Sequence, residues 1–260
     1  MRRRFFTDKF ENSSAFLRGE TAHHLARVLR AEPGQLYELS DGSSVRLGKI
    51  TRVTRDEIEF ALAEEISVEP NRLNCTLLLS IVKFDRFEWA IEKATELGVN
   101  TIVPLASSRS EKSLVASAAK RSHRWEKILI ESAQQARRLR APLLLPISSP
   151  HKAFLEASGS RPNVPENIAS GIQPSALILL SERREARSLR EALSKLVSPS
   201  SREEPRTAAL AIGPEGGWTD EEFAAGADAG FAEASLGGTI LRTETAVTAA
   251  LASLNYALGD

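Results

Sequence analysis

The spacing of hydrophobic and polar residues changes near residue 70, which separates two kinds of pattern. Before that point, short apolar stretches such as residues 35–40 and 57–63 alternate with turn signals, including Asp41-Gly42. This pattern is typical of short β-strands joined by tight turns. Residues 20–30 instead place their apolar side chains at helical spacing. Together these features predict a small β-barrel with one helix over residues 1–70.

After residue 70, near-continuous apolar runs alternate with amphipathic stretches. Residues 73–82 are apolar at most positions, which is typical of a strand buried on both faces of a parallel sheet. Residues 85–98 follow with apolar side chains on one helical face. The same alternation predicts further strands at 99–105, 175–181 and 208–213, and further helices at about 116–139 and 185–197. Strands that alternate with helices indicate a parallel α/β domain over residues 71–260.

Composition narrows the class of protein. Hydrophobic residues make up 42% of the chain and charged residues 26%, ordinary values for a globular protein. The single cysteine, Cys75, excludes an intrachain disulfide and favours a reducing compartment. The basic N-terminus precedes no apolar run, and no segment approaches the ~20 apolar residues of a transmembrane helix. We therefore expect a cytoplasmic protein without a membrane anchor.

The formal net charge is +0, but the charges are distributed unevenly. Residues 107–142 carry nine Lys and Arg against three Glu, and the first 30 residues carry seven basic and three acidic side chains. Residues 203–260 carry two basic and ten acidic side chains. A single charge run is usually a solvated helix face, yet clustered cations bind phosphates even when the total charge is zero. Two separate basic regions favour RNA as a partner.

The strongest chemical signal is the segment AIGPEGGWTDEE, residues 211–222. A predicted strand ends at Ile212, a glycine-rich turn follows, and Thr219 and Glu222 form a capping-box pair at a helix start. Glycines let the backbone approach a ligand closely and expose N–H groups beside a helix N-terminus. The turn has neither the lysine of a Walker loop nor the spacing of a Rossmann fingerprint. A simple strand-to-helix turn remains the alternative.

Two further turns follow predicted strands. Leu236-Gly237-Gly238 comes after a short strand near Ala234 and leads to a helix of small residues from about Thr243. Leu180-Ser181-Glu182 ends another strand. Ligands of open α/β sheets bind beyond the carboxyl ends of the strands, so we expect the three turns to share one pocket. Close packing of a C-terminal helix is the alternative explanation of its small residues.

The GPEGG turn followed by LG-x-x-ILRTETA resembles the SPOUT methyltransferase superfamily, and within it the RsmE family of 16S ribosomal RNA uracil-N3 methyltransferases. Other blocks of that family occur in order: MRRRFF, HHLARVLR, the block from Lys83 to Val99, PLASSRS and QQARRLRAP. The likeness spans essentially the whole chain. One departure is Gln134-Gln135-Ala136, where family members commonly carry Glu-Gln-Ser before the arginine.

The resemblance implies a fold, an assembly and a cofactor. It implies a PUA-like RNA-binding β-barrel over residues 1–70 and a SPOUT domain over residues 71–260 with a parallel sheet and a deep trefoil knot, which periodicity does not predict. It also implies a homodimer with the active site at the subunit interface. The cofactor, S-adenosyl-L-methionine, is expected to bind Leu180, Ser181, Glu182, Ile212, Gly213, Glu215, Gly216, Gly217, Leu236, Gly237, Ile240, Leu241, Arg242, Thr245 and Ala246.

Methylation of uracil N3 requires loss of the N3 proton, and therefore a base or a charge that stabilises the developing anion. Arg242 is the candidate for stabilising a uracil oxygen. Glu244 and Glu215 are alternative candidates for accepting the proton or for binding the amino group of the cofactor. Glu244 is also explained as a first-turn carboxylate that the helix dipole stabilises.

The expected partner is 16S ribosomal RNA within the small ribosomal subunit. Candidate RNA contacts are Arg3, Arg4, His23, Arg27, Arg30, Arg109 and Arg138, of which the last two are also candidates for contacting the dimer partner. Phe5 and Phe6 are expected either to stack on bases or to lie in the core. The pair His23-His24 has no second pair of metal ligands nearby, so no metal site is predicted.

Two other functions stay open from the sequence. The first is a SPOUT methyltransferase with another target, such as a tRNA ribose or another ribosomal RNA position. The second is a non-catalytic RNA-binding protein that assists ribosome assembly. A pure binding protein has no need of glycines at the ends of several strands, which favours the enzyme.

Overall fold

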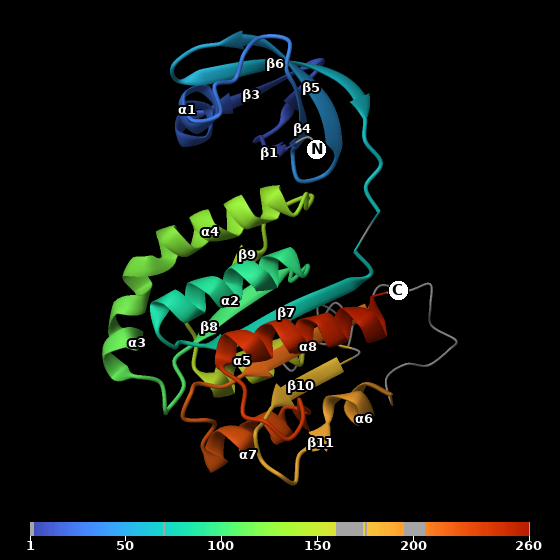
Figure 1. The fold of residues 1–260 in the computed structure, drawn as a ribbon. Coiled ribbons are helices and arrows are strands. Elements are labelled where there is room, and N and C mark those ends of the chain that lie inside the picture. The colour runs from blue at the N-terminus through green and yellow to red at the C-terminus, as the bar shows by residue number, and fades with distance from the viewer. Residues whose placement is uncertain (1–2, 70, 160–173, 175, 195–205, 260) are drawn as a thin grey trace, which may run out of the picture. The chain divides into compact units, whose positions relative to one another are not determined.

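The computed structural model of the protein describes residues 3–69, 71–159, 174, 176–194 and 206–259 (Figure 1). The chain separates into two units with dense internal contacts. The N-terminal unit contains residues 1–70 together with 130–141, and the C-terminal unit contains residues 71–129 together with 142–260. Each unit has its own sheet.

The N-terminal unit is built on a six-stranded sheet with the order β1-β4-β5-β6-β3-β2. Its elements are β1 (Arg4–Phe6), β2 (Phe10–Glu11), β3 (Ser14–Arg18), α1 (Gly19–Arg27), β4 (Leu36–Ser40), β5 (Val45–Val53) and β6 (Glu57–Glu65). The two outermost strands, β1 and β2, are joined by only Thr7–Lys9. The Thr7 hydroxyl also donates to the carbonyl of Phe16 in β3 at 2.9 Å. The short connection curls the sheet toward a barrel.

The predicted helix and turn of this unit are present. Leu25 of α1 is fully buried against Ile58 and Phe60 of β6. At the tight turn before β5, the Asp41 carboxylate accepts from the backbone N–H groups of Ser43 and Ser44 at 2.9 and 2.8 Å. Burial, the largest single influence, raises the pKa of Asp41, but the backbone hydrogen bonds together with one from the Ser43 hydroxyl lower the pKa below its ordinary value.

The C-terminal unit contains a seven-stranded sheet with the order β11-β13-β10-β12-β7-β8-β9, and every pair in it is parallel. The strands are β7 (Leu73–Ser80), β8 (Thr101–Leu105), β9 (Leu143–Leu144), β10 (Ala176–Leu180), β11 (Arg187–Ser188), β12 (Arg206–Ile212) and β13 (Ala232–Ser235). The central strands are buried on both faces, which explains their continuous apolar runs. The parallel α/β prediction is confirmed.

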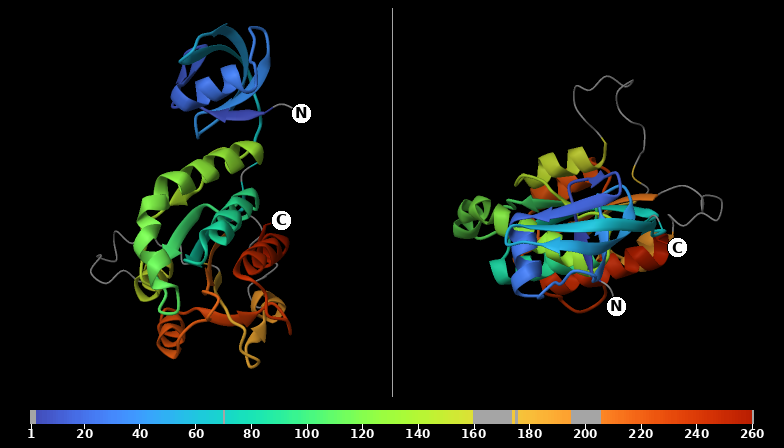
Figure 2. Two further views of the ribbon diagram at one scale, coloured as in Figure 1. Left: turned by 60° about the vertical axis from the view of Figure 1, so that its left-hand side comes forward. Right: turned by 90° about the horizontal axis from the view of Figure 1, so that it is seen from above.

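Helices cover both faces of this sheet. They are α2 (Phe84–Glu96), α3 (Lys112–Ala118), α4 (Ser122–Gln135), α5 (Pro150–Ala157), α6 (Leu189–Ser194), α7 (Asp220–Asp228) and α8 (Thr243–Leu258). Helices α2 and α8 lie side by side on one face (Figure 2). Helices α5 and α7 pack around Phe154 and Trp218 on the other face. Helix α5 was not among the predicted helices.

The long helix predicted at about 116–139 is wrong as a single element. The chain instead forms α3, a 3-10 turn at Ala119–Arg121, and α4. The Ser117 hydroxyl donates back to the carbonyl of Ser113 at 2.8 Å, and the Ser122 hydroxyl donates to the carbonyl of Ala119 at 3.1 Å. Such back-bonding serines compete with the regular helix ladder and bend helices. Helix α4 then ends before Arg137, whose φ is 54°.

No helix in the described part of the chain is long and apolar enough to cross a membrane.

Candidate functional site

The three turns predicted to share a pocket follow three neighbouring strands, β13, β10 and β12. Because all three strands are parallel, their carboxyl ends lie at the same edge of the sheet. The N–H of Ser181 donates to the carbonyl of Ala234 at 2.9 Å and ties the turn after β10 to β13. The structure thus brings these segments together, as expected for a ligand site in an open α/β sheet.

Trp218 connects the glycine-rich turn to the turn after β10. Its buried indole N–H donates to the carbonyl of Leu180 at 3.0 Å. A side chain on Gly213 would begin 3.0 Å from the indole ring, which is closer than carbon atoms normally approach. Gly213 therefore lets the turn pass close over Trp218. Trp218 was not among the residues predicted from the sequence to form the site.

Arg109, from the loop after β8, holds the same turn from another side. Its Nη1 donates to the carbonyls of Gly216 and Trp218, both at 3.0 Å. Gly217 has a φ of 69°, and a Cβ there would lie 3.0 Å from the Glu182 carboxylate. Arg109, which was predicted to contact RNA, thus contacts and holds the glycine-rich turn.

The helix that follows the turn is capped as predicted. Thr219 is the N-cap of α7, and Thr219 and Glu222 make both hydrogen bonds of a capping box. The Glu222 carboxylate also accepts from the N–H of Ser108 at 2.8 Å. One carboxylate therefore secures both the helix start and the loop that carries Arg109.

Glu215, at the tip of the turn, forms an ion pair with Arg86 of α2. The Arg86 guanidinium occupies one oxygen of this carboxylate. Arg86 belongs to the Lys83–Val99 block, but only the folded chain shows which side chain it contacts.

The third turn, after β13, is the most open part of the site. A Cβ on Gly237 or Gly238 would have no atom within 4 Å, and Gly237 has a φ of 120°. The Ile240 side chain is 82% exposed. A large apolar side chain beside an uncovered glycine backbone is suited to contact with a flat, partly apolar ligand.

Arg242 and Glu244 follow this turn at the start of α8. Arg242 is the N-cap residue and is exposed. Glu244 lies in the first helical turn, and its Oε2 is buried without a hydrogen-bond partner among the described residues. Unpaired buried oxygens are costly and are uncommon in folded proteins. The described residues thus supply no donor to this oxygen of Glu244.

The other predicted cofactor residues occupy different surroundings. Ile212 and Leu180 are buried and belong to the main core cluster. Leu236 and Ala246 pack against the same cluster. Ser181 accepts from the N–H of Arg183 at 3.0 Å. Leu241 is half-buried, and Thr245 is exposed on the first turn of α8.

Arg4 of the N-terminal unit does not have the surroundings expected of an RNA contact. It is 5% exposed and donates to the Glu38 carboxylate at 2.9 Å. It also donates to the carbonyl of Arg137, whose own guanidinium lies 3.7 Å from Glu38. This buried cluster joins the N-terminal strands to the segment after α4 and removes Arg4 from the candidate RNA surface.

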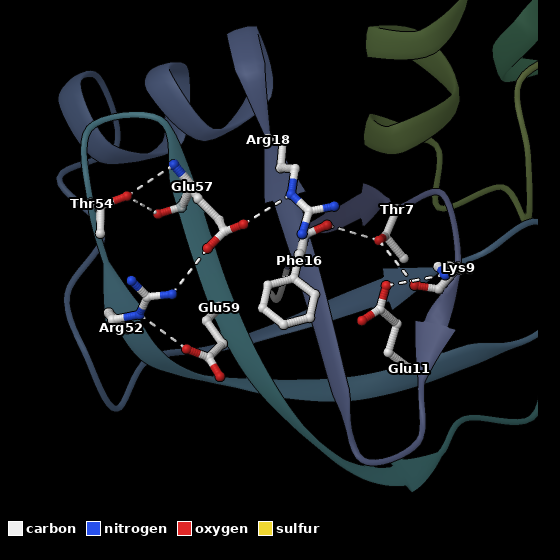
Figure 3. A network of polar contacts seen from close by, with 9 residues as sticks. All are labelled: Thr7, Lys9, Glu11, Phe16, Arg18, Arg52, Thr54, Glu57 and Glu59. Carbon is white, nitrogen blue, oxygen red and sulfur yellow. Dashed lines mark hydrogen bonds and ion pairs between the residues drawn. The ribbon is translucent and has the colours of Figure 1, made fainter.

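Other basic residues of this unit differ in how firmly they are held. Arg18 and Arg52 share the Glu57 carboxylate, and Arg52 also pairs with Glu59 (Figure 3). Arg3, Arg27 and Arg30 are exposed, His23 is half-buried, and no ion pair joins any of these four to another described residue. They remain candidates for phosphate contacts. Phe5 is buried against Tyr37 at a ring distance of 5.6 Å and is a core residue, whereas Phe6 is half-buried.

Arg138 lies in the same unit and is half-buried. Burial lowers its pKa to about 10, and the neighbouring charge of Arg140 contributes to the same effect. The side chain is still cationic at neutral pH. The family departure at residues 134–136 lies at the end of α4, and nothing in the structure explains it.

Comparison with known protein families matches both units to domains of RNA methyltransferases. Residues 69–255 match the model of an RNA methyltransferase domain, and residues 17–62 match an RNA methyltransferase PUA domain. The chain is 32% identical to ribosomal RNA small subunit methyltransferase E of Synechocystis over 91% of this chain and 71% of that protein. It is 30% identical to the protein of that name from Mycobacterium bovis over 96% of this chain and 90% of that protein.

Solved structures agree along the whole chain. The small subunit methyltransferase E of Neisseria gonorrhoeae, bound to S-adenosyl methionine, is 30% identical with a TM-score of 0.79 and covers 98% of both chains. A putative methyltransferase of Legionella pneumophila with bound S-adenosyl methionine is 28% identical with a TM-score of 0.82, covering 100% of this chain and 99% of that one. Together with the parallel sheet and its glycine turns, these matches show that the chain belongs to the RNA methyltransferase family of ribosomal RNA small subunit methyltransferase E.

Proposed function

We propose that this protein transfers a methyl group from S-adenosyl-L-methionine to N3 of a specific uridine in 16S ribosomal RNA of the small ribosomal subunit. The observation that carries the proposal is the open site at the ends of β10, β12 and β13, with its exposed glycine backbone and the unpaired oxygen of Glu244. Relatives of the same family carry the name ribosomal RNA small subunit methyltransferase E. A non-catalytic assembly factor has no use for such a site.

The residues present fit the proposed cofactor. The uncovered backbone at Gly237 and Gly238 accepts a flat group, Ile240 supplies an apolar surface, and Glu244 supplies an acceptor without a donor. The turns after β10 and β12 complete the set, with backbone from 180–182 and 213–217. When bound, S-adenosyl-L-methionine supplies an electrophilic methyl group.

The protein's own residues must then prepare the uracil. We assign to Arg242 the stabilisation of negative charge on a uracil oxygen, because its guanidinium is exposed beside the open turn. Of the two carboxylates proposed as proton acceptor, the surroundings favour Glu244, because Glu215 is paired with Arg86. Glu215 is better suited to holding the glycine-rich turn against α2. Contact between Glu244 and the amino group of the cofactor stays the alternative.

The remaining assignments concern the RNA and the assembly. We propose that Arg3, His23, Arg27 and Arg30 of the PUA-like unit contact RNA, since no ion pair among the described residues holds them. We also propose the deep trefoil knot, a homodimer with the site at the subunit interface, and cytoplasmic action on ribosomal RNA. The exposed Ile240 and the exposed Tyr256 of α8 support a partner surface on the C-terminal unit.

The test is methyl transfer from labelled S-adenosyl-L-methionine to purified small ribosomal subunits from cells that lack this modification. The expected product is 3-methyluridine, identified by mass spectrometry of the digested RNA. Isothermal calorimetry with S-adenosyl-L-methionine alone tests the cofactor separately. If the protein binds the cofactor but forms a different modified nucleoside, the methyltransferase function stands and the proposed target is wrong. If the protein does not bind the cofactor, the proposed enzyme function is wrong.

A further inference from the structure

A pocket of about 340 Å³ lies on the face of the C-terminal sheet that α7 covers. None of the residues predicted to bind the cofactor lines it. Its lining residues are Leu179, Arg183, Asp220, Phe223, Ala224, Ala227, Phe231 and Glu233. Nothing in the proposed methyl transfer uses this pocket.

The packing of α7 against β10 and β13 accounts for this space. Leu179 of β10 and Glu233 of β13 are paired neighbours in the parallel register, so their side chains lie on the same face. Gly226 brings α7 close to the sheet, since a Cβ there would lie 2.7 Å from Leu179. Ala224 and Ala227 of the same helix are exposed and line the space on its open side.

The lining of this pocket includes the carboxylate of Glu233. Oε1 of Glu233 is buried and has no hydrogen-bond partner among the described residues. A buried carboxylate oxygen requires a donor, and an ionised one requires a cation. Neighbouring side chains on this face, such as Leu179 and Phe231, are apolar.

The rim of the pocket carries a second carboxylate. Asp220 is highly exposed and pairs with Arg183, whose guanidinium lies 3.7 Å from the centre of the Phe223 ring. With Glu233, the lining holds two carboxylates and one guanidinium. One negative charge is therefore in excess, which favours a cationic ligand.

We propose that this pocket binds a linear aliphatic diamine. One ammonium group donates to Glu233, the methylene chain lies along Leu179, Phe223 and Phe231, and the second ammonium group is shared with Asp220 at the rim. A charged donor on a buried carboxylate and apolar contact along a short chain are the two features that the lining offers together. This site is separate from the proposed cofactor site and does not depend on the proposed function.

The test uses the full-length protein and putrescine as the probe, with 1,4-butanediol as a neutral molecule of the same chain length. Calorimetry at low salt is expected to show putrescine binding and no butanediol binding. Glu233→Gln, which keeps shape and removes charge, should weaken putrescine binding at least about tenfold. Ala227→Leu, which fills the pocket, should abolish it. Asp228→Asn, at an exposed position of the same helix outside the lining, is the matched control.

Thermal melting of each variant checks that it folds, so that lost binding in a folded protein is informative. The proposal is overturned if the wild-type protein does not bind putrescine at millimolar concentration, or if Glu233→Gln binds it equally well. Competition between putrescine and S-adenosyl-L-methionine would also overturn it, because the pocket would then belong to the cofactor site. Binding of both molecules at once supports two separate sites.

Discussion

Arg242 and Glu244 stand two positions apart, yet their side chains meet different surroundings. Arg242 is the N-cap of α8, with extended backbone dihedrals of φ −65° and ψ 151°, and it is exposed. Glu244 is the second residue of the helix, and its Oε2 is buried. A flexible cation at the surface suits contact with an incoming base, and a carboxylate with one buried oxygen suits a fixed role in the site.

Arg242→Ala should reduce the rate of methyl transfer by about 100-fold, as when one donor to a developing oxyanion is removed. Cofactor affinity measured by calorimetry should change little, because the proposed contact is with the uracil. Arg242→Lys keeps the charge and should recover part of the rate. A rate close to wild type in Arg242→Ala would remove this residue from the mechanism.

Glu244→Gln and Glu215→Gln separate the two candidate bases. Loss of the carboxylate at Glu244 should lower the single-turnover rate by at least about 100-fold. Loss at Glu215 should have a smaller effect on that rate, because Glu215 is paired with Arg86. The contrary result, a larger loss for Glu215→Gln, would reverse the assignment. A fall in cofactor affinity alone for Glu244→Gln would favour contact with the amino group.

The burial of Cys75 in β7 can be measured through the reactivity of its thiol. Burial raises the pKa of its thiol to about 12 from an ordinary 9.0. The native protein keeps the proton while the unfolded chain loses it near pH 9, so the contribution of this thiol to stability is lost as the pH rises from 9 to 12. A thiol reagent at pH 8 should label Cys75 only after unfolding. Rapid labelling of the native protein would contradict its burial.

At the scale of elements, the glycine-rich turn is held by contacts from several parts of the chain. Trp218 bonds to the end of β10, Arg109 reaches two carbonyls of the turn, and Arg86 of α2 pairs with Glu215. The turn contains few side chains of its own that could pack. Its shape therefore depends on these three neighbours, which preorganise it for a ligand.

Gly217→Ala should destabilise the protein by about 1 kcal/mol, because a residue with a side chain is strained in the left-handed region. The new methyl group would also meet the Glu182 carboxylate. Gly238→Ala is the control, since a Cβ there meets no atom within 4 Å. Urea unfolding of both variants gives the comparison. Equal stability of the two would show that strain at Gly217 is unimportant.

At the scale of the whole molecule, the formal net charge of zero does not show which basic side chains can bind RNA. The PUA-like unit carries basic side chains of two kinds, those paired with a glutamate, such as Arg18 and Arg52, and those without an ion pair among the described residues. Only side chains of the second kind can neutralise phosphates without first breaking a salt bridge. We therefore expect RNA affinity to depend on a subset of the basic residues.

The double variant Arg27→Ala, Arg30→Ala should weaken RNA binding and reduce the slope of log affinity against log salt by about one for each lost phosphate contact. The double variant Arg18→Ala, Arg52→Ala removes equal charge from paired positions and should have less effect. Filter binding to small ribosomal subunits over a salt series measures both. Equal losses in the two variants would indicate non-specific charge attraction.

The sequence alone determined the alternation of strands and helices, the capping box at Thr219, and the three turns that were expected to share a site. These features are local, because they depend on periodicity and on the chemistry of adjacent residues. The site residues named from the sequence come from the family motif, and their chemical roles remain predictions.

Only the tertiary structure decided which of these side chains are available. It buried Arg4 against Glu38, paired Glu215 with Arg86, set Arg109 on the glycine-rich turn and left an oxygen of Glu244 without a partner. It also placed Glu233 and Leu179 side by side in a pocket. The physical reason is that each contact joins segments far apart in the chain. Local periodicity specifies which face of an element is buried, but not which charged side chain it will meet.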